Sequence, residues 1–457
     1  MVASALVLLL LLRKFNEDAR SYTFDRYDSR PPGPQNITLD LSYLQGYDIS
    51  STFTYARRMI TTKPFEGERS TLTKINETLF PDYRILEKGG LSAQEVTELA
   101  PLALQVPVFP KFDTSIMSFG IATSIPRLND SIPQLSHWLS NTSSLLTVVA
   151  PSHNDTLDVE LAMQNPPISI NLNITTSSLP FVKAYFSLVK RLYDSRTANT
   201  QWLVLIDDDT FIPSLPYLIS HLSNIYDSSK PQLVAAISDD FDQIRTWGMI
   251  PFGGGGIFIS VPLAALLVAP GVWEKCMASS RNQGDGIFSD CVSIYTDVKP
   301  IFDHGLNQMD IMGSPNAGDG YFESGRRMLT VHHWKSWFDA DIPLAAKVSE
   351  VVGDEGVFMR WCFAGGVVLS NGYSIVEYGE GIGDVDLSKV ERTWDGTDGR
   401  WLHHIGPLRS KLKEDKKKSF RLIDAEMVEG GLRQIYLHKA TEGEAGVDGV
   451  LELFWLK

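Results

Sequence analysis

Alternating strand-like and helix-like segments in the middle of the chain restrict its fold more than any other feature. Short apolar runs, typical of buried strands, lie at residues 116–123, 145–150, 202–206 and 233–237. Between them, apolar residues recur every three or four positions, which predicts helices. These helices span residues 127–139, 181–193 and 215–225. Strands that alternate with helices form parallel sheets covered on both faces. We therefore expect an α/β fold with a Rossmann-like, mostly parallel sheet flanked by helices.

Three consecutive aspartates, Asp207, Asp208 and Asp209, directly follow the apolar run 202–206. Adjacent like charges at a strand end are costly unless a cation neutralises them. In extended chain Asp207 and Asp209 point to the same side. A hard divalent ion would relieve the repulsion, and such an ion can also bind a diphosphate. In open α/β sheets, ligands bind beyond the carboxyl ends of the strands. The triplet therefore indicates a metal–diphosphate site, with an acidic surface loop as the alternative.

Two further motifs contain glycine. Gly253 to Gly256 precede an apolar run, which predicts a glycine-rich turn where a ligand can approach the backbone closely. No G-x-G-x-x-G pattern follows the first strand, which disfavours a dinucleotide fold. Asp285 lies between two glycines, as turn residues often do. If a disulfide pinned this segment, its carboxylate could serve as a positioned general base.

Histidines and cysteines supply the remaining candidates. His332 and His333 end an apolar strand, 329–331, and offer an imidazole to a nearby metal, although paired histidines at a strand end are often merely polar. The chain has three cysteines. In an oxidising compartment a disulfide between Cys276 and Cys291 could close a short loop, and Cys362 would remain unpaired. The alternative is three buried thiols. No two cysteines have zinc-finger spacing.

Length and charge limit the domain organisation and the partners. A chain of 457 residues suits two or three domains, and its net charge of −14 argues against a nucleic-acid partner. Residues 13–110 are turn-rich and are interpreted as a stem or linker, with local helices around residues 93–104. From residue 341 to 457 short strands predict a small antiparallel β extension, in which Asn371-Gly372 is a hairpin signal.

The first part of the chain points to the secretory pathway. Val2 to Leu12 is apolar except for Ser4, but these eleven residues fall short of the roughly 20 that span a bilayer. We interpret residues 1–12 as the remainder of a truncated signal anchor. Six acceptor sequons for N-glycosylation precede residue 180 and none follows, which favours a lumenal chain. They begin at Asn36, Asn76, Asn129, Asn141, Asn154 and Asn173.

The order of these motifs is more specific than any one of them, and it resembles the Fringe-like glycosyltransferases, the β-1,3-glycosyltransferase family 31. It is closest to the DUF604-type branch found in plants and fungi. The resemblance rests on WLVLIDDDTF at 202–211, FGGGGIF at 252–258, Gly284-Asp285 with Cys291, LTVHHWKSW at 329–337, and FGIATS at 119–124 with Arg127. It covers about residues 112–340, so residues 111–340 are expected to form the catalytic domain.

The resemblance implies a GT-A fold, a UDP-sugar donor, Mn²⁺ or another divalent metal, and inversion at the anomeric carbon. By position, Asp209 and His332 would ligate the metal, with His333 as the less favoured choice, and Asp285 would be the base. The remaining residues carried over would contact the donor. Asp207 and Asp208 would lie near the ribose and the metal-bound waters, Thr123, Ser124 and Arg127 would line the uridine pocket, and Gly254 and Gly255 would border donor and acceptor.

Two positions depart from the family pattern. The usual Gly-Gly-Ala-Gly is Gly253-Gly-Gly-Gly256 here, which loses only a methyl group. Animal Fringe enzymes carry two acidic residues at the base position, whereas Gly284 precedes Asp285 in this chain. The second departure bears directly on the assignment of the base.

The expected function is that of an inverting, metal-dependent glycosyltransferase. It would move a hexose or N-acetylhexosamine from a UDP-sugar to a glycan or glycoprotein hydroxyl, in β-1,3 linkage. The expected location is the Golgi or secretory-pathway membrane, with an N-terminal anchor and a lumenal catalytic domain. A catalytically inactive lumenal binding or chaperone protein is the alternative. A metal-dependent phosphohydrolase is disfavoured, because Ala122 to Ser124 and Ala150 to Ser152 offer no further Asp or His ligands.

Overall fold

The computed structural model describes most of the chain after its first 34 residues. The described ranges are 35–110, 112–151, 168–313, 315–338, 340–379, 381–396, 400, 405–440 and 446–457. The predicted hydrophobic segment 1–12 and the sequon at Asn154 lie outside them. Within the described ranges, no helix is both long enough and apolar enough to cross a bilayer.

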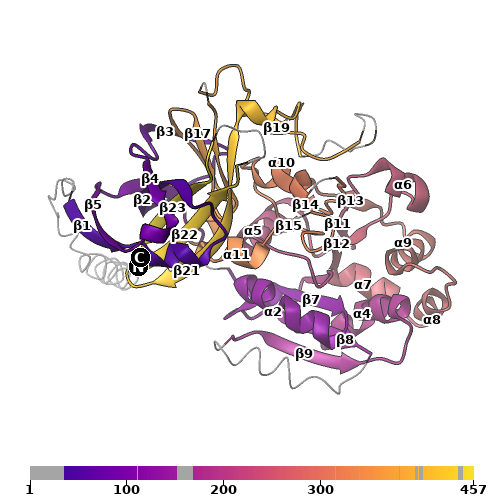
Figure 1. Ribbon diagram of the computed structural model, residues 1–457. Coiled ribbons are helices and arrows are strands. Elements are labelled where there is room, and N and C mark those ends of the chain that lie inside the picture. Colours follow the sequence, from indigo (N-terminus) through magenta and orange to yellow (C-terminus); the bar gives the residue numbers. More distant parts are fainter. Residues whose placement is uncertain are drawn as a thin grey trace, which may run out of the picture.

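A seven-stranded mixed sheet is built from strands between residues 117 and 302 (Figure 1). All its strands run in one direction except β12, which is antiparallel to its neighbours β10 and β11. In spatial order the strands are β13 (Pro300–Phe302), β11 (Leu233–Ala236), β12 (Phe252–Ser260), β10 (Trp202–Leu205), β7 (Met117–Ala122), β8 (Leu145–Ala150) and β9 (Asn171–Thr176). The predicted mostly parallel sheet is therefore confirmed.

Helices cover both faces of this sheet, because alternate strand residues point to opposite sides. Leu203 and Leu205 join the apolar cluster beneath α4, α7, α8 and α9. Trp202 and Val204 join the cluster that contains α2 and α5. The helices are α2 (Ile125–Leu139), α4 (Phe181–Ser195), α5 (Leu215–Ile225), α7 (Val261–Leu267), α8 (Val272–Met277) and α9 (Gly284–Tyr295). Short helix α6 (Phe241–Trp247) follows β11.

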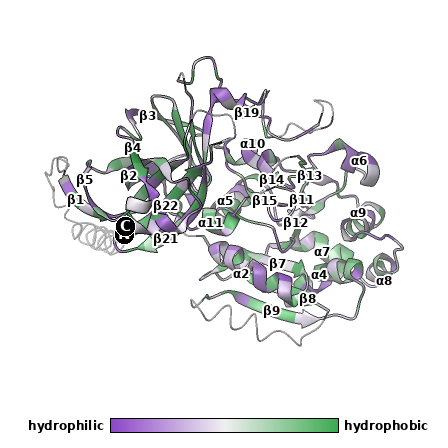
Figure 2. Ribbon diagram, in the orientation of Figure 1, coloured by the Kyte–Doolittle hydropathy of each residue, from purple (hydrophilic) through white to green (hydrophobic). Residues whose placement is uncertain are grey.

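A ten-stranded sheet combines the two ends of the chain (Figure 1). The long strand β2 (Thr52–Phe65) lies parallel to the last strand, β23 (Gly449–Leu456), so that Ile60 pairs with Trp455. The other members are β3 (Thr73–Thr78), β4 (Arg84–Glu87), β6 (Leu102–Pro107), β16 (Arg360–Ala364), β17 (Val367–Ser370), β18 (Ser374–Glu377), β21 (Lys418–Val428) and β22 (Gly431–His438). The strands of both large sheets carry many hydrophobic residues (Figure 2).

This sheet differs from the stem or linker expected over residues 13–110. Where the chain is described, those residues form strands, including β1 (Gln35–Asp40), which pairs with β5 (Ala93–Glu98). The prediction of local helices at 93–104 is wrong, because β5 and β6 occupy that segment. The antiparallel strands β16 to β18 are confirmed, but they belong to a larger sheet than the extension predicted for residues 341–457. The burial of β2 depends on partners at the opposite end of the chain.

The predicted disulfide is present and ties two helices together. Cys276 in α8 and Cys291 in α9 are bonded, and Cys362 in β16 is a buried free thiol. The remaining short elements are helix α10 (Asp319–Phe322) and three further pairs. These are β14 (Leu306–Asn307) with β15 (Thr330–Val331), β19 (Val390–Glu391) with β20 (Leu408–Arg409), and helices α11 (Ile342–Ala346) and α12 (Ser349–Val352) near the ten-stranded sheet.

Candidate active site

The aspartate triplet lies at the carboxyl end of β10, and Thr210 fastens it to the neighbouring strand. The Thr210 hydroxyl donates to the carbonyl of Gly254 in β12 at 2.7 Å and accepts from the backbone N–H of Asp207 at 2.9 Å. Phe211 exchanges backbone hydrogen bonds with Val331 of β15 in both directions. These contacts bring the triplet beside His332, which follows Val331.

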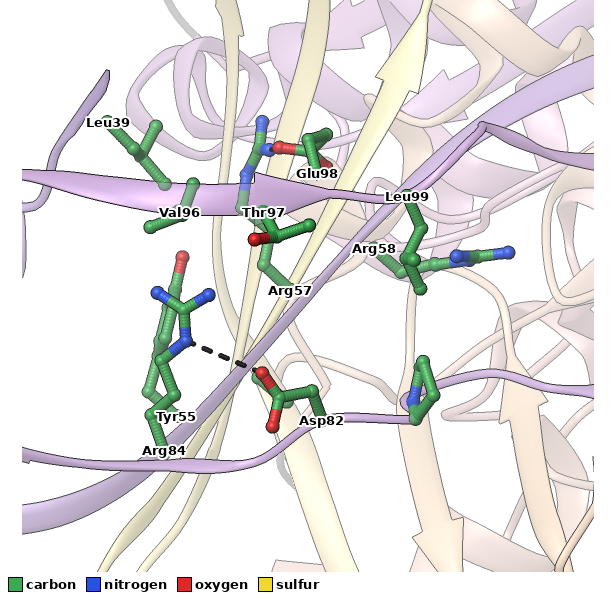
Figure 3. Close-up of a pocket in the computed structure, with 12 residues that line it drawn as sticks. Leu39, Tyr55, Arg57, Arg58, Asp82, Arg84, Val96, Thr97, Glu98 and Leu99 are labelled. Carbon is green, nitrogen blue, oxygen red and sulfur yellow. Dashed lines mark hydrogen bonds and ion pairs between the residues drawn. The ribbon is translucent and has the colours of Figure 1, made fainter. Parts of the chain in front are cut away.

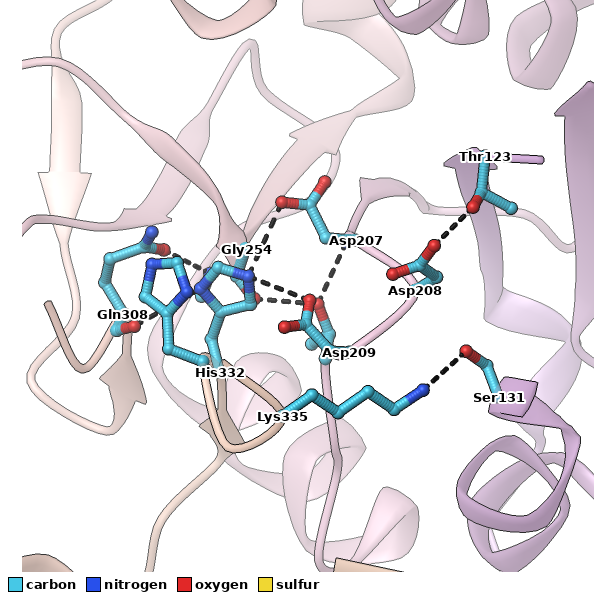
Figure 4. Close-up of polar contacts among 12 residues, drawn as sticks. Thr123, Ser131, Asp207, Asp208, Asp209, Gly254, Gln308, His332 and Lys335 are labelled. Atoms are coloured by element: carbon cyan, nitrogen blue, oxygen red, sulfur yellow. Dashed lines mark hydrogen bonds and ion pairs between the residues drawn. The ribbon is translucent and has the colours of Figure 1, made fainter. Parts of the chain in front are cut away.

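His332 faces two of the three aspartates (Figure 4). Its Nε2 lies 3.1 Å from Asp209 Oδ1 and 3.5 Å from Asp207 Oδ2. Burial alone would raise the pKa of Asp209, but the hydrogen bond and charge of His332 hold this pKa at about 2. Burial would lower the pKa of His332, but Asp207 and Asp209 raise it to about 10. His332 therefore carries a proton that a metal ion must displace in order to bind Nε2.

Glycine at position 254 is required by this arrangement. A β-carbon added to Gly254 would collide with the imidazole of His332, and one added to Gly255 would meet Ala236 and the backbone of Gln308. The predicted glycine-rich turn is wrong, because all four glycines lie within the buried strand β12. Gly254 and Gly255 thus allow side chains to approach the strand closely, whereas other residues form the surface of the cavity.

His333 is the third candidate ligand. Ligand atoms of Asp209, His332 and His333 all lie within 4.8 Å of one another. The backbone of His333 adopts φ +58°, an uncommon left-handed conformation for this residue type. Its Nε2 lies 2.9 Å from Asp310 Oδ1, and its ring stacks on Trp337 with centroids 4.4 Å apart. Nε2 of His333 is therefore already engaged by Asp310.

Sequence reasoning did not identify the partners that orient these histidines. Asp310 contacts His333, and the carbonyl of Gln308 lies 3.3 Å from Nδ1 of His332. The side chain of Gln308 also accepts a hydrogen bond from the Gly255 N–H at 2.6 Å. A carboxylate or carbonyl behind an imidazole is the usual support of a metal-binding histidine. The glycine-broken polar stretch 305–310 was the only signal for them in the sequence.

Asp208 takes a different position from its two neighbours. Its carboxylate forms a bidentate pair with Arg127, with both N–O distances 2.6 Å, and accepts a hydrogen bond from Thr123. Figure 4 shows it turned toward Thr123, away from His332. In this structure Asp208 holds the guanidinium of Arg127 in place at the start of α2, whereas Asp207 and Asp209 face the candidate metal ligands.

Asp285 lies in the first turn of α9, partly buried beside Tyr185. The helix is tied to α8 by the disulfide of Cys291. Burial and the negative charge of Asp207 raise the pKa of Asp285 to about 7. A β-carbon at Gly253 would lie 3.1 Å from Asp285 Oδ1 and would collide with the Tyr185 hydroxyl. Asp285 is thus not a turn residue, the alternative weighed for it, but belongs to a helix terminus that the disulfide pins. Its carboxyl group is poised to exchange a proton near neutral pH.

One cavity of about 930 Å³ brings most of the predicted residues together. Its lining includes Thr123, Ser124, Arg127, Asp207, Asp208, Asp209, Asp285, His332 and His333. It also includes Phe181, Tyr185 and Lys335, which sequence reasoning missed. Lys335 reaches across to Ser131, with Nζ 3.0 Å from its hydroxyl oxygen, and burial lowers its pKa (Figure 4). Its place three residues after His332 was the available signal.

Comparison with known proteins leaves the family open. No family model and no curated protein matches the sequence. Among solved structures, mouse xyloside xylosyltransferase 1 in its apo form is similar with a TM-score of 0.31 and 11% identity, over 47% of this chain and 96% of that protein.

Two further glycosyltransferase structures are similar to the same low degree. The galactosyltransferase LgtC, in complex with donor and acceptor sugar analogs, gives a TM-score of 0.32 and 12% identity over 52% of this chain and 95% of its own. The glycosyltransferase GlyE of Streptococcus pneumoniae TIGR4, in its apo form, gives a TM-score of 0.33 and 11% identity over 52% of this chain and 62% of its own. Similarity at this level does not identify a family or an activity.

Proposed function

We propose that the protein is a metal-dependent glycosyltransferase with a GT-A-type catalytic domain, related to the Fringe-like family. It would move a hexose or N-acetylhexosamine from a UDP-sugar to a hydroxyl of a glycan or glycoprotein, with inversion and in β-1,3 linkage. The observation that carries this proposal is the cavity in which Asp207, Asp209 and His332 converge and whose lining also contains Asp285.

The donor set fits a divalent metal. Asp209, His332 and His333 are the residues that would hold it, with Asp207 close by. Carboxylate and imidazole ligands, each histidine supported from behind, suit Mn²⁺ or a similar ion. When bound, such an ion neutralises a diphosphate and stabilises the charge that grows on the leaving group. The cavity lining contains five acidic residues. Its Lys and Arg residues are two, Arg127 and Lys335, so a metal ion would balance the excess of negative charge.

The chain's own side chains would position the donor and accept the proton. Lys335 places an ammonium group next to the triplet, where it can pair with a phosphate oxygen. The acceptor oxygen attacks the anomeric carbon, the bond from that carbon to the diphosphate breaks, UDP leaves, and the acceptor proton passes to Asp285. A pKa of about 7 suits this base at neutral pH. One displacement with one base inverts the configuration.

A location in the secretory pathway, with a lumenal catalytic domain and a membrane anchor before it, is part of the proposal. It is supported by the disulfide and by the exposure of four sequon asparagines: Asn36, Asn76, Asn141 and Asn173. Asn129 is less suited to glycosylation, because it lies within α2 and is only partly exposed. Deglycosylation of the secreted chain should therefore shift its mobility on a gel, and substitution of Asn129 should leave that shift unchanged.

The direct test of activity is UDP release from a panel of UDP-sugars. We expect one sugar to support donor hydrolysis with Mn²⁺ and EDTA to abolish it, because the diphosphate charge would then be unopposed. A folded protein that binds UDP but releases none from any UDP-sugar, with or without acceptor, would instead favour the inactive binding protein.

A further inference from the structure

A second cavity, of about 240 Å³, lies at the edge of the ten-stranded sheet, where β4 and β6 pair with different parts of β2 and leave a gap between them. Its lining contains three arginines and two acidic residues. Arg57 is paired with Glu98, and Arg84 lies 3.6 Å from Asp82 (Figure 3). Nε and Nη1 of Arg58 are buried and do not reach the cavity surface. The excess of positive charge in this cavity therefore does not define a ligand site.

In the candidate active site, two glycines of the sequence motifs make room for the side chain of Tyr185 in α4. A β-carbon added to Gly253 would collide with the Tyr185 hydroxyl, and one added to Gly284 would collide with its ring. Gly253 lies in β12 and Gly284 at the start of α9, so the ring fits between a central strand and the helix that carries Asp285. Tyr185 is 5% exposed and contributes to the cavity lining. Two separate elements are thus adapted to this one side chain.

The Tyr185 hydroxyl lies beside one oxygen of the Asp285 carboxylate. A β-carbon at Gly253 would approach both groups, with Asp285 Oδ1 3.1 Å away. Both atoms are buried, and neither has a hydrogen bond of ordinary geometry to a described residue. Burial and the charge of Asp285 hold the pKa of Tyr185 well above its usual range, so the hydroxyl keeps its hydrogen and can donate a hydrogen bond to the ionised carboxylate. A buried donor next to a buried acceptor provides the partner that each requires.

The two oxygens of Asp285 lie in different surroundings. Asp285 belongs to the cavity lining, yet its Oδ1 is buried beside Tyr185. A carboxylate is planar, so a hydrogen bond that fixes Oδ1 also fixes the direction of Oδ2. A general base must bring one oxygen within hydrogen-bond reach of the proton that it takes, and such contacts are often long before the substrate binds. A donor behind Oδ1 would therefore determine where Oδ2 points during the reaction.

We propose that Tyr185 is a positioning residue, whose hydroxyl donates to Oδ1 of Asp285 and thereby directs Oδ2 toward the acceptor hydroxyl. This inference rests on the proposed function, in which Asp285 is the base. The acceptor proton passes to Oδ2, the electron pair of its O–H bond forms the new bond to the anomeric carbon, and the bond from that carbon to the diphosphate breaks. The hydrogen of Tyr185 stays on its own oxygen throughout, so Tyr185 acts only through Asp285.

The test is steady-state UDP release by the full chain with Mn²⁺ and the UDP-sugar that it hydrolyses fastest, with water in place of the acceptor hydroxyl. Tyr185→Phe removes one oxygen and keeps the ring between the two glycines, so the fold should be retained in a thermal melt. We expect kcat to fall about tenfold, the effect of one hydrogen bond, while the Michaelis constant for the donor changes little. Tyr193→Phe, on the same helix but outside the cavity lining, should keep the parent kcat.

A double-mutant cycle separates positioning from packing. If Tyr185 acts through Asp285, adding Tyr185→Phe to Asp285→Asn should cause no further loss of kcat. A tyrosine that only supports the fold would slow both backgrounds by the same factor, and that result would overturn the inference. Unchanged kcat in Tyr185→Phe, in a parent whose turnover requires Asp285, would overturn this inference and leave the proposed function intact. A folded parent that releases no UDP from any UDP-sugar would overturn the proposed function, and this inference with it.

Discussion

The two cavities of this protein solve opposite electrostatic problems. The cavity at the carboxyl end of β10 gathers five aspartates against Arg127 and Lys335, whereas the cavity at the edge of β2 gathers three arginines against two acidic residues. In the proposed function the first cavity would hold a cation, whereas the lining of the second carries a surplus of positive charge. The difference shows that the charge of a whole chain says little about the charge that any one site presents to its ligand.

The largest expected effect comes from a residue that would bind the proposed metal directly. Asp209→Asn removes one negative charge with almost no change in size, so we expect Mn²⁺ affinity and UDP-sugar turnover to fall at least about a hundredfold. Calorimetry with Mn²⁺ and UDP-release assays would measure both. Asp194→Asn, an exposed acid on α4, is the matched control. Undiminished Mn²⁺ affinity in Asp209→Asn would refute the metal assignment.

Asp285→Asn should affect chemistry rather than binding. Loss of the general base lowers kcat by about 10² to 10⁴, while the Michaelis constant for the donor changes little. The variant should remain folded, because it removes a buried carboxylate that is repelled by Asp207. Steady-state kinetics and a thermal melt would test this. Asp290→Asn on the same helix is the control. A fully active Asp285→Asn variant would refute the assignment of Asp285 as the base.

The pH profile should reveal the same group. The ionised form of Asp285 is the base, so kcat/KM should be constant above the pKa of about 7 and fall about tenfold per pH unit below it. A bound cation favours the ionised form of Asp285 and shifts this acidic limb of the pH profile, the fall in kcat/KM, to lower pH. Rates measured from about pH 5 to about pH 9 would show it, and the residual activity of Asp285→Asn should lack the limb. An identical limb in that variant would assign it to another group.

Lys335→Gln should give the smallest effect of the series. Lys335 contributes one charge to a partly exposed cavity, so we expect UDP affinity to fall about tenfold. Arg196→Gln, which also removes one positive charge, should retain full UDP affinity. Unchanged UDP affinity in Lys335→Gln would contradict a contact between Lys335 and the diphosphate.

The sequence predicted the first cavity well because its parts are local. The strand β8 and the helix α5 occupy the predicted residues, since apolar periodicity within one segment determines both. The carboxyl ends of the strands then place Asp207 and Asp209 at one edge, as the general rule for open sheets requires. His332 and Asp285 line the same cavity.

What sequence reasoning missed depends on contacts between distant segments. The pairing of Ile60 with Trp455 leaves no local signal, so residues 13–110 were taken for a stem or linker. Gly254 was assigned to a turn because its role, close approach of the His332 ring, is visible only in three dimensions. The pairing of Asp208 with Arg127 and the support of His333 by Asp310 were hidden for the same reason. The cavity of Arg58 requires a gap between β4 and β6.

The central claim is that Asp209 and His332 hold a divalent ion and, through it, a nucleoside diphosphate. Calorimetry of UDP binding to the folded protein, first with Mn²⁺ and then with EDTA, tests it most directly. The account predicts binding with Mn²⁺ that weakens at least about tenfold when the ion is removed. A well-folded protein with no measurable affinity for UDP in either condition would contradict it.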